Sequence, residues 1–298
     1  MISIIICSHN KILRNQISIN IEQTIGLDYE ILITDNSLNE VGICKAYNDC
    51  AIQAKYEYLV FCHEDILFHT PNWGILLINH FSNTNARIVG FLGCVIKTRT
   101  PSSAYIYNSD LNRHNQLQRY PNGNSIHCYE NPLNEKISEV SVVDGFFMAT
   151  KKEYWQNTKF SEDYLKGFHA YDIDFSLKNY QLGKIIVVYD ILIEHFSFGN
   201  FTSSWVDAQL SLTKKWNLYL PFYINSTIYQ VRIAEINNIK ELLKILIANN
   251  GSKKLIIIYY LKLLHLSPIN NLNMFLIRKI ILGNRLDNKI KSLITRRK

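Results

Sequence analysis

The chain has 298 residues, of which 47% are hydrophobic and 19% charged, and its net charge is +7. This length allows one large α/β domain, or an ordinary domain with an appendage, and an ample core in either case. The charge is uneven, because residues 251–298 hold 11 Lys and Arg against one acidic residue, Asp287. The basicity belongs to this tail, so a nucleic-acid partner for the whole protein is disfavoured.

The cysteines indicate a reducing compartment. They show no CxxC pair and no metal-ligand spacing: Cys7, Cys44, Cys50, Cys62, Cys94 and Cys128. Several fall in expected strands or helices, where cysteine acts as a small buried hydrophobe. Residues 1–7 lack a basic segment and a small-residue cleavage site, so we expect no secretory signal and a cytoplasmic location.

Strand-like and helix-like segments alternate at the start of the chain. Residues 2–8 form an apolar run. Ile17, Ile21 and Ile25 then recur at helical spacing, and Gly26 is placed to end that helix. A strand, a helix and a strand are expected next, over residues 29–34, 41–54 and 57–62. Three strands joined by helices predict a parallel sheet of nucleotide-binding type.

The middle of the chain contains a long polar segment. Pro71 opens a predicted helix over residues 72–81, and residues 88–96 are predicted to form one apolar strand. Residues 97–136 have no clear elements, which is typical of a lid, a binding loop or partial disorder. Their aromatics suit stacking on sugar rings, although loop packing explains them equally well: Tyr105, Tyr107, Tyr120 and Tyr129.

Regular elements return after residue 136. Strands are expected over residues 140–143, 146–150 and 184–193, and Ile173, Leu177 and Tyr180 mark an amphipathic helix that ends near Gly183. We place a compact domain at residues 1–222 and a basic α-helical region at residues 223–298. The longest mostly apolar run, residues 255–266, is too short to span a bilayer.

An acidic triplet, His63-Glu64-Asp65, follows directly on the third predicted strand. The carboxyl end of a buried strand is where an open α/β sheet binds its ligand. A carboxylate there can hold a divalent cation, and the cation can hold a diphosphate. The alternative is that Asp65 only caps the next turn or helix.

Other polar groups also follow predicted strands or open a helix. In chain order they are Ser8-His9-Asn10, Asp35-Asn36-Ser37, Asn48, Asp144-Gly145, Tyr171-Asp172-Ile173-Asp174 and His195. In this order and position the chain resembles the GT-A-fold glycosyltransferases of the large inverting family two. It is most similar to the bacterial glycosyltransferase-like subgroup whose metal motif reads H-x-D. The resemblance covers residues 1–200 and implies an α/β fold with a mostly parallel, Rossmann-like sheet, followed here by a C-terminal α-helical extension.

The resemblance implies a donor site and a metal site. The implied nucleotide-sugar-binding residues are Ser8, His9, Asn10, Asp35, Asn48, His63, Glu64, Asp144 and Gly145. Asp65 and His195 would bind Mn²⁺ or Mg²⁺. His63 replaces the first Asp of the usual triplet, so whether it contacts the metal or the nucleotide stays open. Asp35 would accept a hydrogen bond from the imide N–H of uracil or thymine.

The resemblance also implies the catalytic base. Asp172 aligns with the base of the family's E-D-x-D motif, where Tyr171 replaces the Glu. One base and a direct displacement predict inversion at the anomeric carbon. Without the resemblance, Asp172 and Asp174 are both explained by their place in the first turn of a helix, where the helix dipole favours carboxylates.

The expected function is metal-dependent transfer of a sugar from a UDP- or dTDP-sugar to a glycan or lipid-linked acceptor, in bacterial surface polysaccharide synthesis. A sugar nucleotidyltransferase is an alternative, but Ser8-His9-Asn10-Lys11 lacks the glycines of a phosphate loop. A non-catalytic carbohydrate-binding or scaffold protein is another. The basic tail, residues 251–298, is expected to lie on an anionic membrane surface, or else to pack on the domain or on a second subunit.

Overall fold

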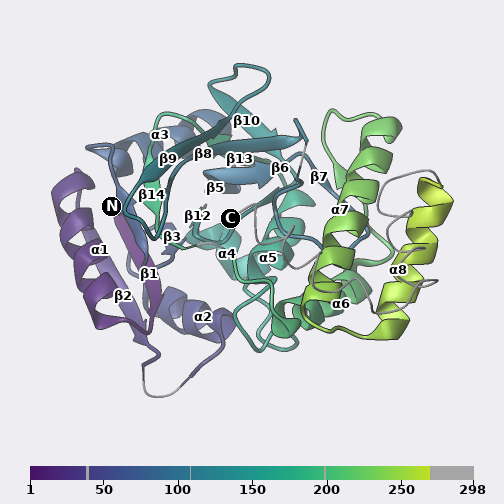
Figure 1. The fold of residues 1–298 in the computed structure, drawn as a ribbon. Coiled ribbons are helices and arrows are strands. Elements are labelled where there is room, and N and C mark those ends of the chain that lie inside the picture. Colours follow the sequence, from purple (N-terminus) through teal and green to yellow (C-terminus); the bar gives the residue numbers. More distant parts are fainter. Residues whose placement is uncertain (38–39, 108, 198, 269–298) are drawn as a thin grey trace.

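The computed structural model describes residues 1–37, 40–107, 109–197 and 199–268 (Figure 1). Its main sheet has seven strands in the order β10-β13-β5-β12-β3-β1-β2. The strands are β1 (Ile2–Ser8), β2 (Tyr29–Asp35), β3 (Tyr58–Cys62), β5 (Ile88–Gly90), β10 (Ile137–Val140), β12 (Phe147–Lys151) and β13 (Ile185–Val188). β1 is parallel to both β2 and β3, and β13 is parallel to β5. β12 and β10 run antiparallel to their neighbours. The prediction of an α/β fold with a parallel core is confirmed.

Helices cover both faces of this sheet. The helices of the described residues are α1 (Lys11–Thr24), α2 (Ile43–Gln53), α3 (Trp73–Thr84), α4 (Lys152–Thr158), α5 (Tyr171–Tyr180), α6 (Ser203–Trp216), α7 (Ile228–Ala248) and α8 (Lys253–Leu266), of which α8 packs on α7 and not on the sheet. On β1, Ile4 packs with α1 and α3, whereas Ile5 packs with α2 and α5. Both residues are fully buried, because successive side chains of a central strand point to opposite, covered faces. The mostly apolar run at residues 2–6, in which Ser3 is the one polar residue, has this cause.

A second sheet lies against the main one and supplies part of the site. Its order is β11-β6-β8-β14-β4, and β9 pairs with β8. The strands are β4 (Ile66–Phe68), β6 (Leu92–Cys94), β8 (Asn112–Arg119), β9 (Ser125–Glu130), β11 (Val142–Val143) and β14 (Ile193–His195). A third pair, β7 (Ile96–Lys97) and β15 (Phe222–Tyr223), is antiparallel.

Two predictions about the middle of the chain are wrong. Residues 88–96 are not one strand, because the chain passes from the main sheet (β5) to the second sheet (β6) and then to β7. Gly90 is the last residue of β5 and Gly93 lies within β6, and an added Cβ would fall 2.9 Å from Val143 at Gly90 and 2.5 Å from the carbonyl oxygen of Val142 at Gly93. The segment 97–136 is not simply a loop, since it contains the β8–β9 hairpin.

The predicted strand over residues 184–193 is likewise two strands, β13 and β14, which belong to different sheets. By contrast, the first helix ends where it was expected. Ile25 is its C-cap, and Gly26 follows with φ +74°, a left-handed conformation that glycine adopts without a steric cost.

The C-terminal helices are joined to the rest of the fold by packing and hydrogen bonds. Val231 and Ala234 of α7 lie in the core cluster that also contains α2 and α5. Glu235 accepts hydrogen bonds from the backbone of Arg99 at 3.0 Å and from the hydroxyl of Thr100 at 2.5 Å. Within the described residues, no helix is both long and apolar enough to cross a membrane. Most of the tail's positive charge, in residues 269–298, lies outside the described residues.

Candidate active site

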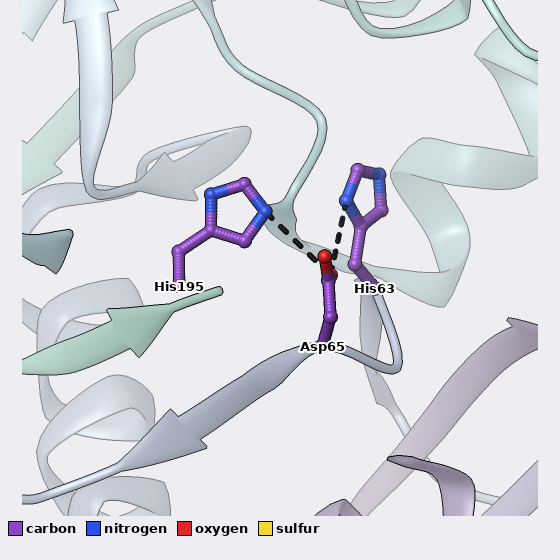
Figure 2. Close-up of side chains that lie close together, drawn as sticks. All are labelled: His63, Asp65 and His195. Carbon is purple, nitrogen blue, oxygen red and sulfur yellow. Dashed lines mark ion pairs between the residues drawn. The ribbon is translucent and has the colours of Figure 1, made fainter. Parts of the chain in front are cut away.

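Two imidazoles and a carboxylate meet where β3 of the main sheet and β14 of the second sheet end. His63 and Asp65 follow β3, and His195 is the last residue of β14. Nε2 of His195 lies 3.5 Å, and Nδ1 of His63 lies 3.7 Å, from the same Oδ1 atom of Asp65. Figure 2 shows both rings turned toward that carboxylate. These separations exceed hydrogen-bond length, and the three groups offer ligand atoms within 4.8 Å of one another.

This donor set fits a divalent metal ion. Nitrogen and oxygen ligands about 2 Å from a shared ion are compatible with the observed separations. Of the two ions expected from the sequence, two imidazoles beside one carboxylate suit Mn²⁺ better than Mg²⁺, because Mg²⁺ is bound almost entirely through oxygen. Three protein ligands would leave coordination positions open for phosphate oxygens.

A chain of hydrogen bonds fixes the ring of His63. Its Nε2 lies 2.8 Å from the hydroxyl of Tyr171, and that hydroxyl donates to the carbonyl oxygen of Gly145 at 3.1 Å. Since Tyr171 has one hydroxyl proton, Nε2 of His63 must be the donor, and its Nδ1 keeps the lone pair that faces Asp65. Burial also lowers the pKa of His63. The neutral ring that a metal ion needs is therefore favoured.

Asp65 and His195 are held by their surroundings. The ring of His195 stacks on Phe146 with the centroids 5.0 Å apart. Burial opposes the ionisation of Asp65, but the facing ring of His195, with the side chain of Ser197, holds the pKa of Asp65 well below its usual range. Asp65 is thus a carboxylate at every pH near neutrality, as a metal ligand must be.

A second acidic pair, Asp144 and Asp172, lies beside the Tyr171 hydroxyl. Asp144 follows β11, and Asp172 is in the first turn of α5. A Cβ on Gly145 would lie 2.3 Å from the Tyr171 hydroxyl oxygen and 3.0 Å from Cβ of Asp172, so only glycine allows this approach. Burial, and then the charge of Asp144, raise the pKa of Asp172 to about 7. A carboxylate with this pKa can accept a proton near neutral pH.

Lys97 is a site residue that the sequence reasoning missed. It is 1% exposed, and its Nζ donates to the carbonyl and hydroxyl oxygens of Ser102 at 2.5 and 2.7 Å. Burial lowers the pKa of Lys97 to about 8, while Asp172 and Glu235 act against that shift. The positive charge of Lys97 in turn favours the ionised form of Asp172. The one signal in the sequence that could have pointed to Lys97 is its position directly after the apolar run of residues 88–96.

Asp174 has a different environment from Asp172. Its side chain is 1% exposed and accepts hydrogen bonds from Nε1 of Trp216 at 2.9 Å and from the hydroxyl of Tyr164. Nζ of Lys178 lies 3.1 Å away. These contacts join α5 to α6, so Asp174 has a structural role. The structure thus distinguishes Asp172 from Asp174, although both lie in the first turn of the same helix.

Glu64 organises the loop between β1 and α1. Its buried carboxylate accepts hydrogen bonds from the Ser8 hydroxyl at 2.6 Å and from the backbone N–H groups of His9 and Asn10. Asn10 in turn caps α1, since its Oδ1 accepts from two backbone N–H groups of the first turn. These side chains position the loop that follows β1, and the His9 side chain is 80% exposed.

Asp35 and Asn48 lie in unlike surroundings. Asp35, at the end of β2, accepts a hydrogen bond from Arg14 at 2.6 Å, which, together with hydrogen bonds from Ser37, holds the pKa of the Asp35 carboxyl well below its usual range. Asn48 is buried, and its carboxamide bonds the backbone of Phe160 through both ends. These contacts fix α2 to the segment before α5, so we leave Asn48 out of the proposed donor site.

The chain belongs to the glycosyltransferase-like family, whose profile matches residues 3–219. The resemblance noted from the sequence is confirmed at this level. No curated protein matches the chain.

Two solved structures show distant similarity to this chain. A structure of GalNAc-T7 with UDP, GalNAc and Mn²⁺ shares 12% identity with a TM-score of 0.48, covering 67% of this chain but 44% of GalNAc-T7. Residues 1–349 of S. aureus TarS, in complex with UDP, share 11% identity with a TM-score of 0.49, covering 82% of this chain and 71% of that one.

Proposed function

We propose that this chain is an inverting, metal-dependent glycosyltransferase that uses a UDP- or dTDP-sugar as donor. Membership of the glycosyltransferase-like family gives the reaction class. The observation that carries the mechanism is the Tyr171 hydroxyl, which contacts both His63 and Gly145. Asp172, the carboxylate with the raised pKa, is the next residue after Tyr171. In the proposed mechanism, His63, Asp65 and His195 therefore act in one site with Asp172.

In the proposed reaction, different residues stabilise the leaving group and activate the acceptor. A divalent cation on Asp65, His63 and His195 would neutralise the charge that develops on the leaving diphosphate. Asp172 takes the proton of the acceptor hydroxyl while the acceptor oxygen bonds to the anomeric carbon. The bond from that carbon to the diphosphate oxygen breaks in the same step, and its electron pair leaves with the nucleoside diphosphate. A single displacement inverts the anomeric configuration.

The donor's nucleoside would lie at the ends of β1 and β2. There the loop at Ser8, His9 and Asn10 is shaped by Glu64, and the Asp35 carboxylate is half-exposed. A carboxylate kept ionised by Arg14 can accept the imide N–H of uracil or thymine. Asp144 and Gly145 would lie beneath the sugar, where the absence of a side chain permits close backbone approach.

The acceptor is proposed to be a glycan or lipid-linked saccharide of a surface polysaccharide, used at the cytoplasmic face of a membrane. On α8, Ile257 and Leu261 are 56% and 58% exposed on one helical face, and Lys254 and Lys262 lie close by in sequence. Exposed apolar side chains among lysines favour an anionic membrane surface.

The proposed function is tested with a panel of UDP- and dTDP-sugars and saccharide acceptors, with and without Mn²⁺. We expect acceptor-dependent release of UDP or dTDP only when the metal is present. NMR of the product should show the inverted anomer. A retained anomer would reject the single displacement. Donor binding without turnover on any acceptor would favour a carbohydrate-binding or scaffold role.

A further inference from the structure

A groove of about 700 Å³ lies next to the strands that carry the cluster of His63, Asp65 and His195. One wall is a face of α1, with Gln16, Ile19 and Gln23 at helical spacing. The end of β8 and the turn after it also line the groove, with Arg119. Phe196 is a further lining residue. The volume lies within the range of pockets that bind small ligands.

The groove and the cluster use opposite faces of the same strands. Cα pairing places His195 beside Gln118, and Glu194 beside Leu117. Since neighbours along a strand point to opposite faces, Glu194 and Arg119 lie on the face away from His195. The backbone N–H of Phe196 donates to the carbonyl oxygen of Asp65 at 3.0 Å. The groove is therefore a separate cavity, but it adjoins the ends of the strands that carry the site.

Arg119 is held in place on the groove wall. Its Nε donates to buried Glu194 at 2.6 Å, and Glu194 is also contacted by Ser125 and by His69 at 3.0 Å. The guanidinium lies over the ring of Phe196, 5.5 Å from the centroid. Glu194 balances the charge of Arg119, so the groove presents hydrogen-bond donors without an uncompensated charge. It does not favour an anionic ligand.

The remaining lining suits carbohydrate. Phe196 and Ile19 offer apolar surface, and Ile19 is 55% exposed. The exposed carboxamides of Gln16 and Gln23 each offer both a donor and an acceptor, which matches the paired hydroxyls of a sugar ring. The apolar faces of sugar rings can pack on Phe196 while sugar hydroxyls form hydrogen bonds with the carboxamides and Arg119.

We propose that this groove is a second saccharide site, which binds a neutral oligosaccharide segment of the acceptor chain away from the reacting sugar. Its use as an acceptor site rests on the proposed function. Saccharide binding itself does not, and it is measured without donor or metal. If the groove binds saccharide but the protein shows no turnover, the proposed function fails while the groove's saccharide binding stands. The two failures can therefore be told apart.

The test is saturation-transfer NMR and calorimetry on the full-length chain with neutral tetrasaccharides of glucose, galactose and N-acetylglucosamine, in EDTA and without nucleotide. At least one should bind. Ile19→Glu, and the double variant Gln16→Ala with Gln23→Ala, should each weaken binding about tenfold, the effect of losing one or two hydrogen bonds or their apolar support. The matched control is Ile52→Glu, at an isoleucine of α2 that is 61% exposed, and it should bind normally.

Three results would overturn the proposal. One is that no tetrasaccharide of the panel binds. Another is that Ile19→Glu and Ile52→Glu bind equally well. The third is that UDP with Mn²⁺ displaces the oligosaccharide completely, because the saccharide would then occupy the metal site and not the groove.

Discussion

At the scale of single residues, Asp172 and Asp174 are carboxylates in one helical turn with opposite surroundings. Asp172 adjoins the Asp144-Gly145 turn and has a raised pKa, whereas Asp174 is buried among Tyr164, Trp216 and Lys178. The same chemical change should therefore have different effects at the two positions.

Asp172→Asn should lower kcat by about 10²-fold or more and leave donor binding near normal, because a general base contributes at least that much. Its thermal midpoint should stay equal or rise, since a disfavoured charge beside Asp144 is removed. Asp174→Asn should lower the midpoint and keep kcat per folded molecule. Turnover, donor calorimetry and thermal unfolding check this. A larger loss of kcat in Asp174→Asn, with donor binding kept, would mean that Asp174 is the base.

The pH dependence of turnover follows from the same residue. Because the pKa of Asp172 is raised to about 7, this carboxyl is mostly protonated at pH 6 and cannot accept the acceptor's proton. We expect kcat to rise with pH through about 7 and then level off. A pH profile of kcat at saturating donor and metal measures it. A kcat that is flat from pH 5.5 to 8.5 would contradict the assignment.

Lys97→Met should move that rise to higher pH, because the variant removes a positive charge that favours the ionised Asp172. Lys45→Met is the matched control, since Lys45 is an exposed lysine that pairs with Asp49 on α2. Circular dichroism would establish that the Lys97 variant is folded. An unchanged profile, or one moved to lower pH, would exclude an electrostatic role of Lys97.

At the scale of elements, the sequence predicts best where burial and hydrophobicity agree. β1 and β3 are apolar and buried, so their positions follow from the residues alone. β8 is also buried, but it reads Asn112-Arg113-His114-Asn115-Gln116, and these polar side chains gave no strand signal. Their burial depends on tertiary contacts, such as the bonds from the Asn115 carboxamide to the carbonyl oxygens of Tyr189 and Ile191. No local pattern contains that information.

The site residues show the same contrast between what the local sequence predicts and what depends on tertiary contacts. Asp65 follows a strand that could be recognised, and His195 comes at the end of an apolar run, so their meeting was predictable from the resemblance. The orientation of His63 was not, because it depends on the Tyr171 hydroxyl from a helix 108 residues further along. Lys97 was missed for a similar reason, since its partners come from the loop after β7 and from α7.

For the C-terminal elements, removal of residues 251–298 should release the protein from anionic vesicles and leave donor binding intact. α8 exposes Ile257 and Leu261, and the removed stretch holds 11 Lys and Arg against one acidic residue. Each well-placed Lys or Arg contributes about 1 kcal/mol near anionic headgroups. Co-sedimentation with liposomes measures the difference, and binding should weaken as salt is added. Equal pelleting of both proteins, or binding that ignores salt, would favour packing of the tail on protein.

At the scale of the whole molecule, the two sheets and the helices meet at the proposed site. The main sheet supplies His63 and Asp65, the second sheet supplies His195, and α5 supplies Tyr171 and Asp172. α7 belongs to this assembly as well, through the hydrogen bonds that Glu235 accepts from the loop after Lys97. Family membership and the central parallel strands were predictable. How the second sheet completes the site depends on the crossings of the chain from β5 to β6 and from β13 to β14.

The central claim is that Asp65 and its two histidines hold a metal ion that binds the donor's diphosphate. Calorimetric titration of UDP, with and without Mn²⁺, tests it most directly. In the unmodified protein Mn²⁺ should tighten UDP binding about tenfold or more, and Asp65→Asn should abolish that gain while leaving the thermal midpoint nearly unchanged. His195→Ala should give a milder loss. Asp190→Asn, at a separate His–Asp pair with His80, should behave as the unmodified protein. An Mn²⁺ effect of equal size in Asp65→Asn would contradict the account.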